Sequence, residues 1–96
     1  RPGDGFITDS LGWVYFRMGD TERALKYLMK ANSLVPGEPT ILDHIGEVMF
    51  ARGDVKAALK YFEQAFDAGR RKKSPDEREQ ERLKEKIDKL KGGQGL

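Results

Sequence analysis

The feature that most constrains this sequence is an internal repeat with a period of 34 residues. Aligned with itself at that offset, the chain matches residues 1–38 to residues 35–72 without a gap. The positions identical in both copies are Pro2/Pro36, Gly3/Gly37, Ile7/Ile41, Asp9/Asp43, Gly12/Gly46, Val14/Val48, Phe16/Phe50, Gly19/Gly53, Asp20/Asp54, Ala24/Ala58, Leu25/Leu59, Lys26/Lys60, Tyr27/Tyr61 and Ala31/Ala65. A fixed period of this length is typical of proteins that stack one supersecondary unit on the next. The repeat therefore predicts a stacked array rather than a globule around one central core.

Each unit has the pattern of two helices joined by a tight turn. Gly19 supplies the left-handed residue that ends one helix, and Asp20 caps the next, as Gly53 and Asp54 do in the second unit. The apolar spacing within each helix predicts one buried stripe. In the first helices these stripes are Ile7, Leu11, Val14, Tyr15 and Met18, then Ile41, Ile45, Val48 and Met49. In the second helices they are Ala24, Leu25, Leu28 and Ala31, then Ala58, Leu59, Phe62, Ala65 and Phe66.

Small residues recur where the two helices of a unit should approach most closely. We expect Gly12 to face Ala24, and Gly46 to face Ala58, because larger side chains would force the axes beyond about 8–10 Å. Ala31 and Ala65 occur near the ends of the second helices, where the following unit is expected to pack closely.

These positions together resemble the tetratricopeptide repeat. The matching residues are Leu11-Gly12, Tyr15, Ala24, Leu28, Ala31 and Pro36, then Ile45-Gly46, Met49, Ala58, Phe62 and Ala65. The resemblance implies an all-α fold with two tandem helix-turn-helix hairpins, residues 5–38 and 39–72, in a right-handed α-solenoid. The second unit departs from the pattern with Met49 in place of an aromatic residue and Arg70 in place of the closing proline. The missing proline indicates that the array ends there.

Both ends of the chain carry further predictions. Residues 1–4 align with residues 35–38, so we interpret them as the tail of a preceding repeat in a longer array. The first hairpin should then expose an unusually apolar face, or pair it with another copy. At the other end, Ser74-Pro75-Asp76-Glu77 matches a capping box and predicts a capping helix over residues 73–91. Its narrow stripe of Leu83, Ile87 and Leu90 should cover the last hairpin, with a coiled-coil seam as the alternative. Residues 92–96 are predicted to be disordered.

The resemblance also implies that the first helices line a concave groove that holds an extended peptide or a helix. The predicted partner-binding residues are Phe6, Asp9, Trp13, Phe16, Arg17, Asp43, His44, Glu47 and Phe50, with Ser10 and Thr40 beside them. Trp13 and Phe16 are large aromatic residues of the kind that anchor interfaces, although Trp13 could instead pack against a neighbouring repeat. Asp9, Asp43 and Glu47 make the predicted groove acidic, which favours a basic or apolar segment over a peptide carboxylate.

The composition excludes several classes of function. A net charge of +2, from 18 basic and 16 acidic residues, is too weak for a nucleic-acid surface. The basic run from Arg70 to Lys73 is explained by its place at a helix C-terminus, where positive charge is favourable. No apolar run reaches the ~20 residues that would insert into a membrane. The sequence lacks cysteine, and its single histidine, His44, stands apart from any metal-ligand or nucleophile motif, so no catalytic, metal or cofactor site is predicted.

The sequence therefore predicts a protein-binding scaffold and not an enzyme. One alternative is an oligomerisation element that self-associates through the exposed N-terminal face. A second, an RNA-reading repeat, is disfavoured by the acidic residues of the first helices. The sequence of the two first helices is similar to that of the last repeats of bacterial multi-repeat proteins. This similarity leaves both the cell envelope and the cytoplasm open as locations.

Overall fold

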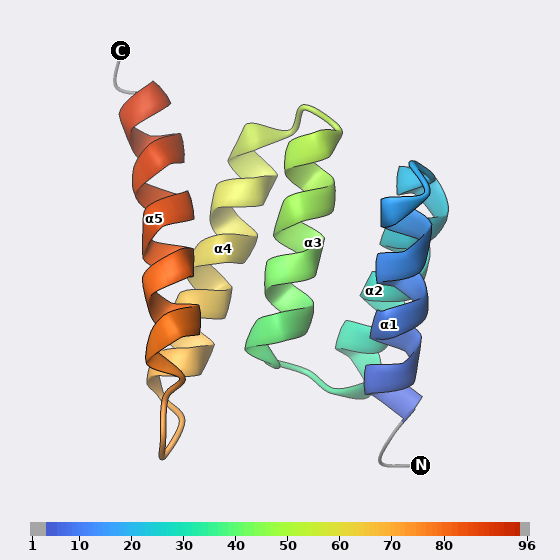
Figure 1. The fold of residues 1–96 in the computed structure, drawn as a ribbon, viewed down its shortest axis with the longest axis horizontal. Coiled ribbons are helices and arrows are strands. Elements are labelled where there is room, and N and C mark those ends of the chain that lie inside the picture. Colours follow the sequence, from blue (N-terminus) through green and yellow to red (C-terminus); the bar gives the residue numbers. More distant parts are fainter. Residues whose placement is uncertain (1–3, 95–96) are drawn as a thin grey trace.

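The computed structural model describes residues 4–94, which form five α-helices and no strand (Figure 1). The helices are α1 (Asp4–Arg17), α2 (Thr21–Leu34), α3 (Pro39–Ala51), α4 (Val55–Arg70) and α5 (Glu77–Gln94). The all-α fold predicted from the sequence is confirmed. Helix α1 begins at Asp4, so this residue is not part of an extended tail, and residues 1–3 lie outside the described part of the chain.

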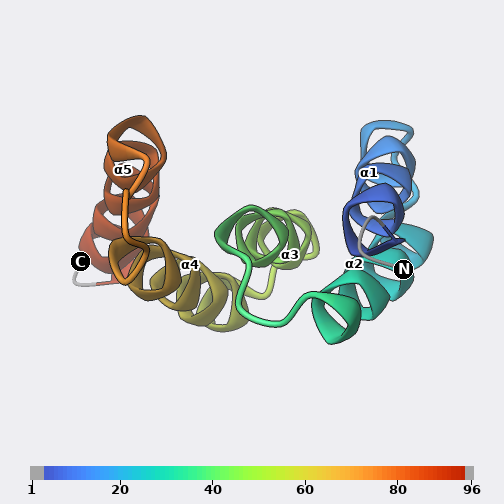
Figure 2. The same cartoon turned by 90° about the horizontal axis from the view of Figure 1, so that it is seen from below.

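The helices form two antiparallel hairpins and a fifth helix, arranged as a curved row. Helices α1 and α2 make the first hairpin, α3 and α4 make the second, and α5 packs on α4 (Figure 1). Seen from below, α1, α3 and α5 lie on the inner side of the curve, and α2 and α4 lie on its outer side (Figure 2). The inner surface is thus built from three helices, one of which lies outside the repeats.

The turn within each hairpin has the geometry that its sequence predicts. Gly19 and Gly53 adopt φ of 86° and 85°, a conformation that side chains with a Cβ rarely adopt. The following aspartates cap the second helices, because Asp20 Oδ1 accepts from the backbone N–H of Arg23 and Asp54 Oδ1 accepts from that of Ala57, each at 3.0 Å. These matching turns set the same hairpin geometry in both units.

The core lies between successive layers of the row rather than at one centre. The first cluster joins α2 to α3, and its fully buried members are Ala24, Leu28, Ala31, Ile41, Ile45 and Val48. The second joins α3 and α4 to α5, with Leu42, Ala58, Phe62, Ala65, Leu83 and Ile87. Burial of Leu83 and Ile87 confirms that the stripe of α5 covers the last hairpin.

The apolar stripe of α1 is not buried, contrary to the sequence prediction. Ile7, Leu11, Val14 and Met18 are all exposed, and only Tyr15 is half-buried. The reason is positional: α2 covers the equivalent stripe of α3, whereas no helix among residues 4–94 packs on the side of α1 that faces away from α3, at the end of the row. Helical spacing identifies an apolar face but not the element that covers it.

The close approach within each hairpin involves a neighbour that the sequence analysis did not name. A Cβ on Gly46 would lie 2.5 Å from Phe62 Cε1, and a Cβ on Gly12 would lie 2.9 Å from Leu28 Cγ. Ala24 contributes its carbonyl oxygen at 3.2 Å from the same position on Gly12. The glycines therefore make room for a large apolar side chain of the second helix, and Gly12 also lies against Ala24 as predicted.

Helix α5 differs from its prediction at both ends. Asp76, not Ser74, caps it, because Asp76 Oδ1 accepts from the backbone N–H of Glu79 at 3.1 Å. A carboxylate two residues closer to the helix competes with the serine, so Pro75 stays outside the helix. The helix continues to Gln94, past the predicted end near Lys91. Glycine costs a helix only about 1 kcal/mol per residue, so Gly92 does not have to stop it. Residues 95–96 lie outside the described part.

Candidate functional site

A cavity of about 400 Å³ opens on the inner side of the curve, between α1, α3 and α5. The side chains that line it are Trp13, Phe16, Thr40, Asp43, His44, Glu47, Glu79, Arg82 and Lys86. Five of these are residues predicted to bind a partner: Trp13, Phe16, Asp43, His44 and Glu47. The structure thus brings residues from two repeats and from α5 to one concave surface.

One wall of this cavity is aromatic. The Trp13 ring stacks on the His44 ring, with centroids 4.0 Å apart and an interplanar angle of 18°. Phe16 lies beside Trp13 at 4.9 Å between centroids. Trp13 is therefore both a packing residue between the repeats and a lining residue of the cavity. Packing against the neighbouring repeat and facing a partner in the cavity are therefore compatible roles for Trp13.

Asp9 lies beneath this wall and is not an accessible acid of the groove. Its side chain is buried, and its Oδ1 lies 2.8 Å from Nδ1 of His44 on the neighbouring repeat. A buried carboxylate is stable only when it is paired or hydrogen-bonded, and His44 supplies that partner. The pair joins α1 to α3 and fixes the imidazole on which Trp13 stacks.

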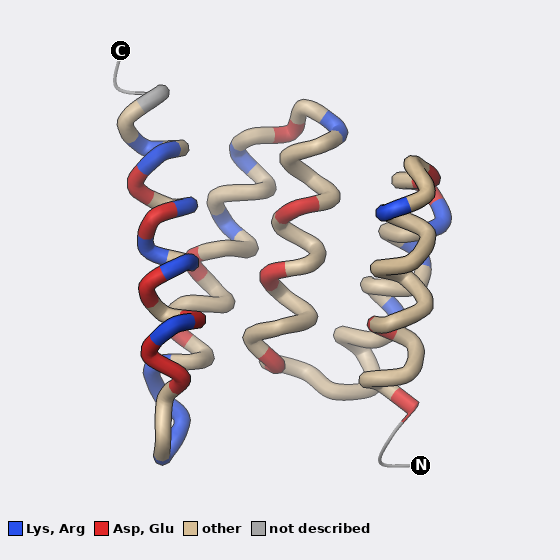
Figure 3. Tube along the Cα trace, viewed as in Figure 1, with Lys and Arg blue, Asp and Glu red and all other residues tan. Residues whose placement is uncertain are grey.

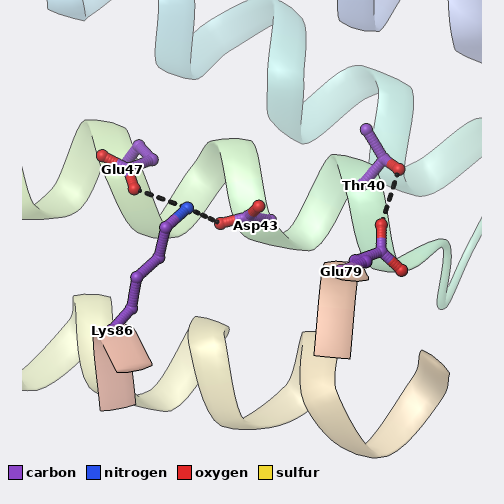
Figure 4. Close-up of polar contacts among 5 residues, drawn as sticks. All are labelled: Thr40, Asp43, Glu47, Glu79 and Lys86. Carbon is purple, nitrogen blue, oxygen red and sulfur yellow. Dashed lines mark hydrogen bonds and ion pairs between the residues drawn. The ribbon is translucent and has the colours of Figure 1, made fainter. Parts of the chain in front are cut away.

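The acids at the centre of the cavity are paired by α5. Lys86 Nζ donates to Asp43 Oδ1 and lies within ion-pair distance of Glu47 Oε2, each at 2.8 Å (Figure 4). Burial alone would lower the pKa of Lys86, but the hydrogen bonds and negative charges of Asp43 and Glu47 outweigh it and raise that pKa above its ordinary value. The Thr40 hydroxyl donates to Glu79 at 3.2 Å in the same view. The predicted acidity of the groove is thus largely neutralised within the chain.

Besides the buried Asp9, three residues predicted for the groove do not line this cavity: Phe6, Arg17 and Phe50. All three are exposed. Phe50 lines a smaller hollow of about 150 Å³, together with Phe62 and Leu90, between α3, α4 and α5. This hollow borders the main cavity through Glu47 and Lys86, which line both.

Sequence reasoning missed the residues that α5 contributes: Glu79, Arg82 and Lys86. Their spacing of three and four residues places them along one face of a helix, beside the stripe that contains Leu83 and Ile87. This signal was present in the sequence. The spacing could not show that this face of α5 would lie opposite α3.

Two matches to family models cover most of the repeated region. The tetratricopeptide repeat matches residues 10–37 in the first unit and residues 40–72 in the second. The chain belongs to the tetratricopeptide repeat family. No curated protein sequence matched the chain. Tetratricopeptide repeats are generally modules of protein–protein interaction and are typically not enzymes.

Within the part of the chain that the structure describes, the tetratricopeptide repeats show neither a metal site nor a membrane-spanning helix. Residues 4–94 contain no group of three or more His, Cys, Asp or Glu side chains placed to hold a metal ion. Over the same residues, no helix has the length and apolar character that crossing a membrane requires. The concave cavity is the candidate site because side chains from both repeats and from α5 line it.

Proposed function

We propose that the concave face binds a peptide segment or a helix of another protein, with an apolar side chain of that partner against Trp13 and Phe16. The observation that carries this proposal is the aromatic wall beside a cavity of about 400 Å³ that spans both repeats and α5. Aromatic residues in partly desolvated concave positions are where binding energy concentrates. On this proposal the chain is a binding scaffold and not an enzyme.

Two partner chemistries were predicted from the sequence, a basic segment and an apolar one. The geometry supports the apolar one, because Lys86 already pairs with both Asp43 and Glu47. A basic side chain of a partner would have to displace Lys86 before it reached those carboxylates. Arg82 also lines the cavity, and within residues 4–94 it makes no ion pair, so an acidic residue next to the apolar anchor would be accommodated.

Trp13 provides a direct test because it is the only tryptophan of the chain. Peptides would be selected from a random library on the immobilised chain, and each would then be titrated while the fluorescence of Trp13 is followed. We expect a change in this fluorescence on binding. Phe16→Ala should weaken binding by about tenfold or more, which is the effect of losing one well-packed anchor.

Met29→Ala is the matched control, because Met29 is an exposed apolar residue of α2 that does not line the cavity. It should leave the affinity unchanged. Arg82→Ala should weaken the selected peptides that carry an acidic residue and spare the others. The proposal fails if the selected peptides bind wild type and Phe16→Ala equally, with no response from Trp13.

A further inference from the structure

A second hollow adjoins the main cavity, and the proposed function does not use it. This hollow measures about 150 Å³, lies between α3, α4 and α5, and has Phe50, Phe62 and Leu90 as its apolar lining. Phe50 is 51% exposed and occupies the position in the second repeat that Phe16 occupies in the first. Because Phe16 lines the main cavity, each repeat presents the equivalent phenylalanine to one of two adjoining hollows.

Lys86 separates the two hollows and is not available to a partner. It lines both of them, and its Nζ lies 2.8 Å from a carboxylate oxygen of Asp43 and of Glu47 (Figure 4). The same atom lies 5.3 Å from the centroid of the Phe62 ring. An ammonium group that already has two carboxylates and an aromatic face around it gains little from a further acid. A partner must therefore recognise other charges of the groove.

Two other cations of α5 line the hollows without a partner of their own. Arg82 lines the main cavity and Lys89 the second hollow, and neither makes an ion pair or a hydrogen bond within residues 4–94. The remaining acid of the main cavity, Glu79, accepts from the Thr40 hydroxyl. Figure 3 shows that the charged positions of α3 are acidic, whereas Lys and Arg recur along α5. The charges that stay open to a partner are thus the positive ones of α5.

The two unpaired cations divide the concave face into two subsites of the same kind. The first subsite consists of Trp13, Phe16 and Arg82, and the second consists of Phe50, Leu90 and Lys89. We propose that the partner is an acidic amphipathic helix of another protein, which places one apolar side chain and one carboxylate in each subsite. The second subsite extends the first, so the proposal rests on the proposed function.

The spacing of the two cations favours a helix over an extended segment. Arg82 and Lys89 are seven residues apart, which is about two turns and about 10 Å along one face of α5. A partner helix that lies alongside has the same rise, so acidic residues seven positions apart reach both cations. In an extended segment, residues about 10 Å apart are three positions apart and point to opposite faces. Helices α1 and α5 flank α3 on the inner side of the curve (Figure 2), and the partner helix would lie over α3 between them.

The expected contributions of the two kinds of contact differ in size. Arg82 and Lys89 are exposed, and an exposed ion pair strengthens binding by about two- to fivefold. The apolar contact with Phe50 should contribute about tenfold, as a packed aromatic anchor does. Salt distinguishes the two, because dissolved ions screen exposed charge pairs and leave apolar contacts nearly unchanged.

A library of alanine-based peptides of about 20 residues, long enough to be helical in water, provides the probe. The peptides carry Leu, Glu, Lys or Ala at the variable positions and are selected on the immobilised 96-residue chain. Selected peptides should have two glutamates seven positions apart, with a leucine beside each, and should bind more weakly as the salt concentration rises. A peptide of the same composition with its glutamates five positions apart carries them on opposite sides of the helix. It should bind about threefold more weakly or worse.

Substitutions in the second subsite leave the core intact, because Phe50 and Lys89 are exposed. Phe50→Ala should weaken binding of the selected peptides about tenfold and Lys89→Gln about threefold. Lys84→Gln is the matched control: it removes an equal charge from α5, but Lys84 lines a different hollow, with Glu63 and Phe66, and the affinity should not change. Replacing the peptide glutamate opposite Lys89 by glutamine should weaken binding to wild type but not to Lys89→Gln.

The outcomes separate the acidic helix from the proposed function itself. If Phe16→Ala weakens binding while Phe50→Ala and Lys89→Gln do not, the concave face binds a partner but the second subsite is refuted. Selected peptides that are rich in lysine, or that lack paired glutamates, would equally overturn the acidic helix. If Phe16→Ala has no effect either, both proposals are wrong. A selection that recovers no binding peptide overturns both as well.

Discussion

The two repeats allow one substitution to be made in two environments within a single molecule. Ile41 and Ile7 are equivalent positions of the first helices, but Ile41 is fully buried against α2 and Ile7 is 68% exposed. Replacing each by alanine removes the same three carbon atoms. The difference in the free energy of unfolding between the two variants therefore measures how much burial beneath a neighbouring helix contributes to the stability of the fold.

The magnitudes follow from these exposures. For Ile41→Ala, three buried carbons at about 0.8 kcal/mol each give about 2.4 kcal/mol. The cavity left beneath α2 adds to this, for a total loss of about 3–4 kcal/mol. For Ile7→Ala, most of the side chain is already in water, so the loss should be about 0.5 kcal/mol. The two variants should differ by about 3 kcal/mol.

Urea denaturation followed by far-ultraviolet circular dichroism gives both values. With a slope of about 1 kcal/mol/M for a chain of this size, the midpoint should fall by about 3 M for Ile41→Ala and by at most about 0.5 M for Ile7→Ala. Measurements at micromolar protein keep self-association from adding to the stability of wild type. An equal loss for both variants at that concentration would refute the reasoning, since it would mean that Ile7 is covered within the monomer.

Three further perturbations test other parts of the structure. Gly46→Ala should destabilise the fold by about 1–2 kcal/mol, because the clash of its Cβ with the buried Phe62 ring outweighs the gain of about 1 kcal/mol in helix propensity; a more stable variant in urea would contradict this. Asp54→Ala removes the side-chain acceptor of the Ala57 N–H and should cost about 1 kcal/mol in the same assay, whereas Asp54→Asn should cost much less. The raised pKa of Lys86 stabilises the folded state fully below the ordinary pKa of lysine, about 10.4, and this contribution is lost as the pH rises through the higher folded value. Comparison of wild type with Lys86→Gln between pH 9 and pH 12 should therefore show a difference in stability that shrinks as the pH rises, and a constant difference would contradict the pairing.

The repeated pattern was enough to predict the fold and the hairpin turns. Gly19, Asp20 and their equivalents act through local backbone geometry and hydrogen bonds to residues three positions away, so the sequence around them contains the whole cause. The spacing of Leu83 and Ile87 likewise identified the apolar stripe of α5, although their burial comes from packing against α3 and α4. Structural features that depend only on neighbouring residues can thus be predicted from the sequence around them.

The candidate site was predicted less completely, because its causes are not local. Trp13 and Phe16 were predicted to lie on the concave surface, but the pairing of Asp43 and Glu47 with Lys86 depends on residues about 40 positions away in the sequence. Likewise, the spacing of the α1 stripe gives no information on which helix covers it. These two misses concern the relative placement of helices rather than the helices themselves.

The bond between Asp9 and His44 also bears on how the molecule opens. In a linear array, each hairpin is held by its neighbours alone, so the terminal hairpin can unfold as a separate cooperative unit. The first hairpin is attached through the packing of α2 on α3, through the hydrogen bond from the Tyr61 hydroxyl to Met29 Sδ, and through this pair with its stacked Trp13. Amide protons of α1 should therefore exchange with solvent faster than those of α3. A peptide in the concave cavity would contact both hairpins and slow that exchange. The rate of amide exchange in α1 would therefore report whether the cavity is occupied.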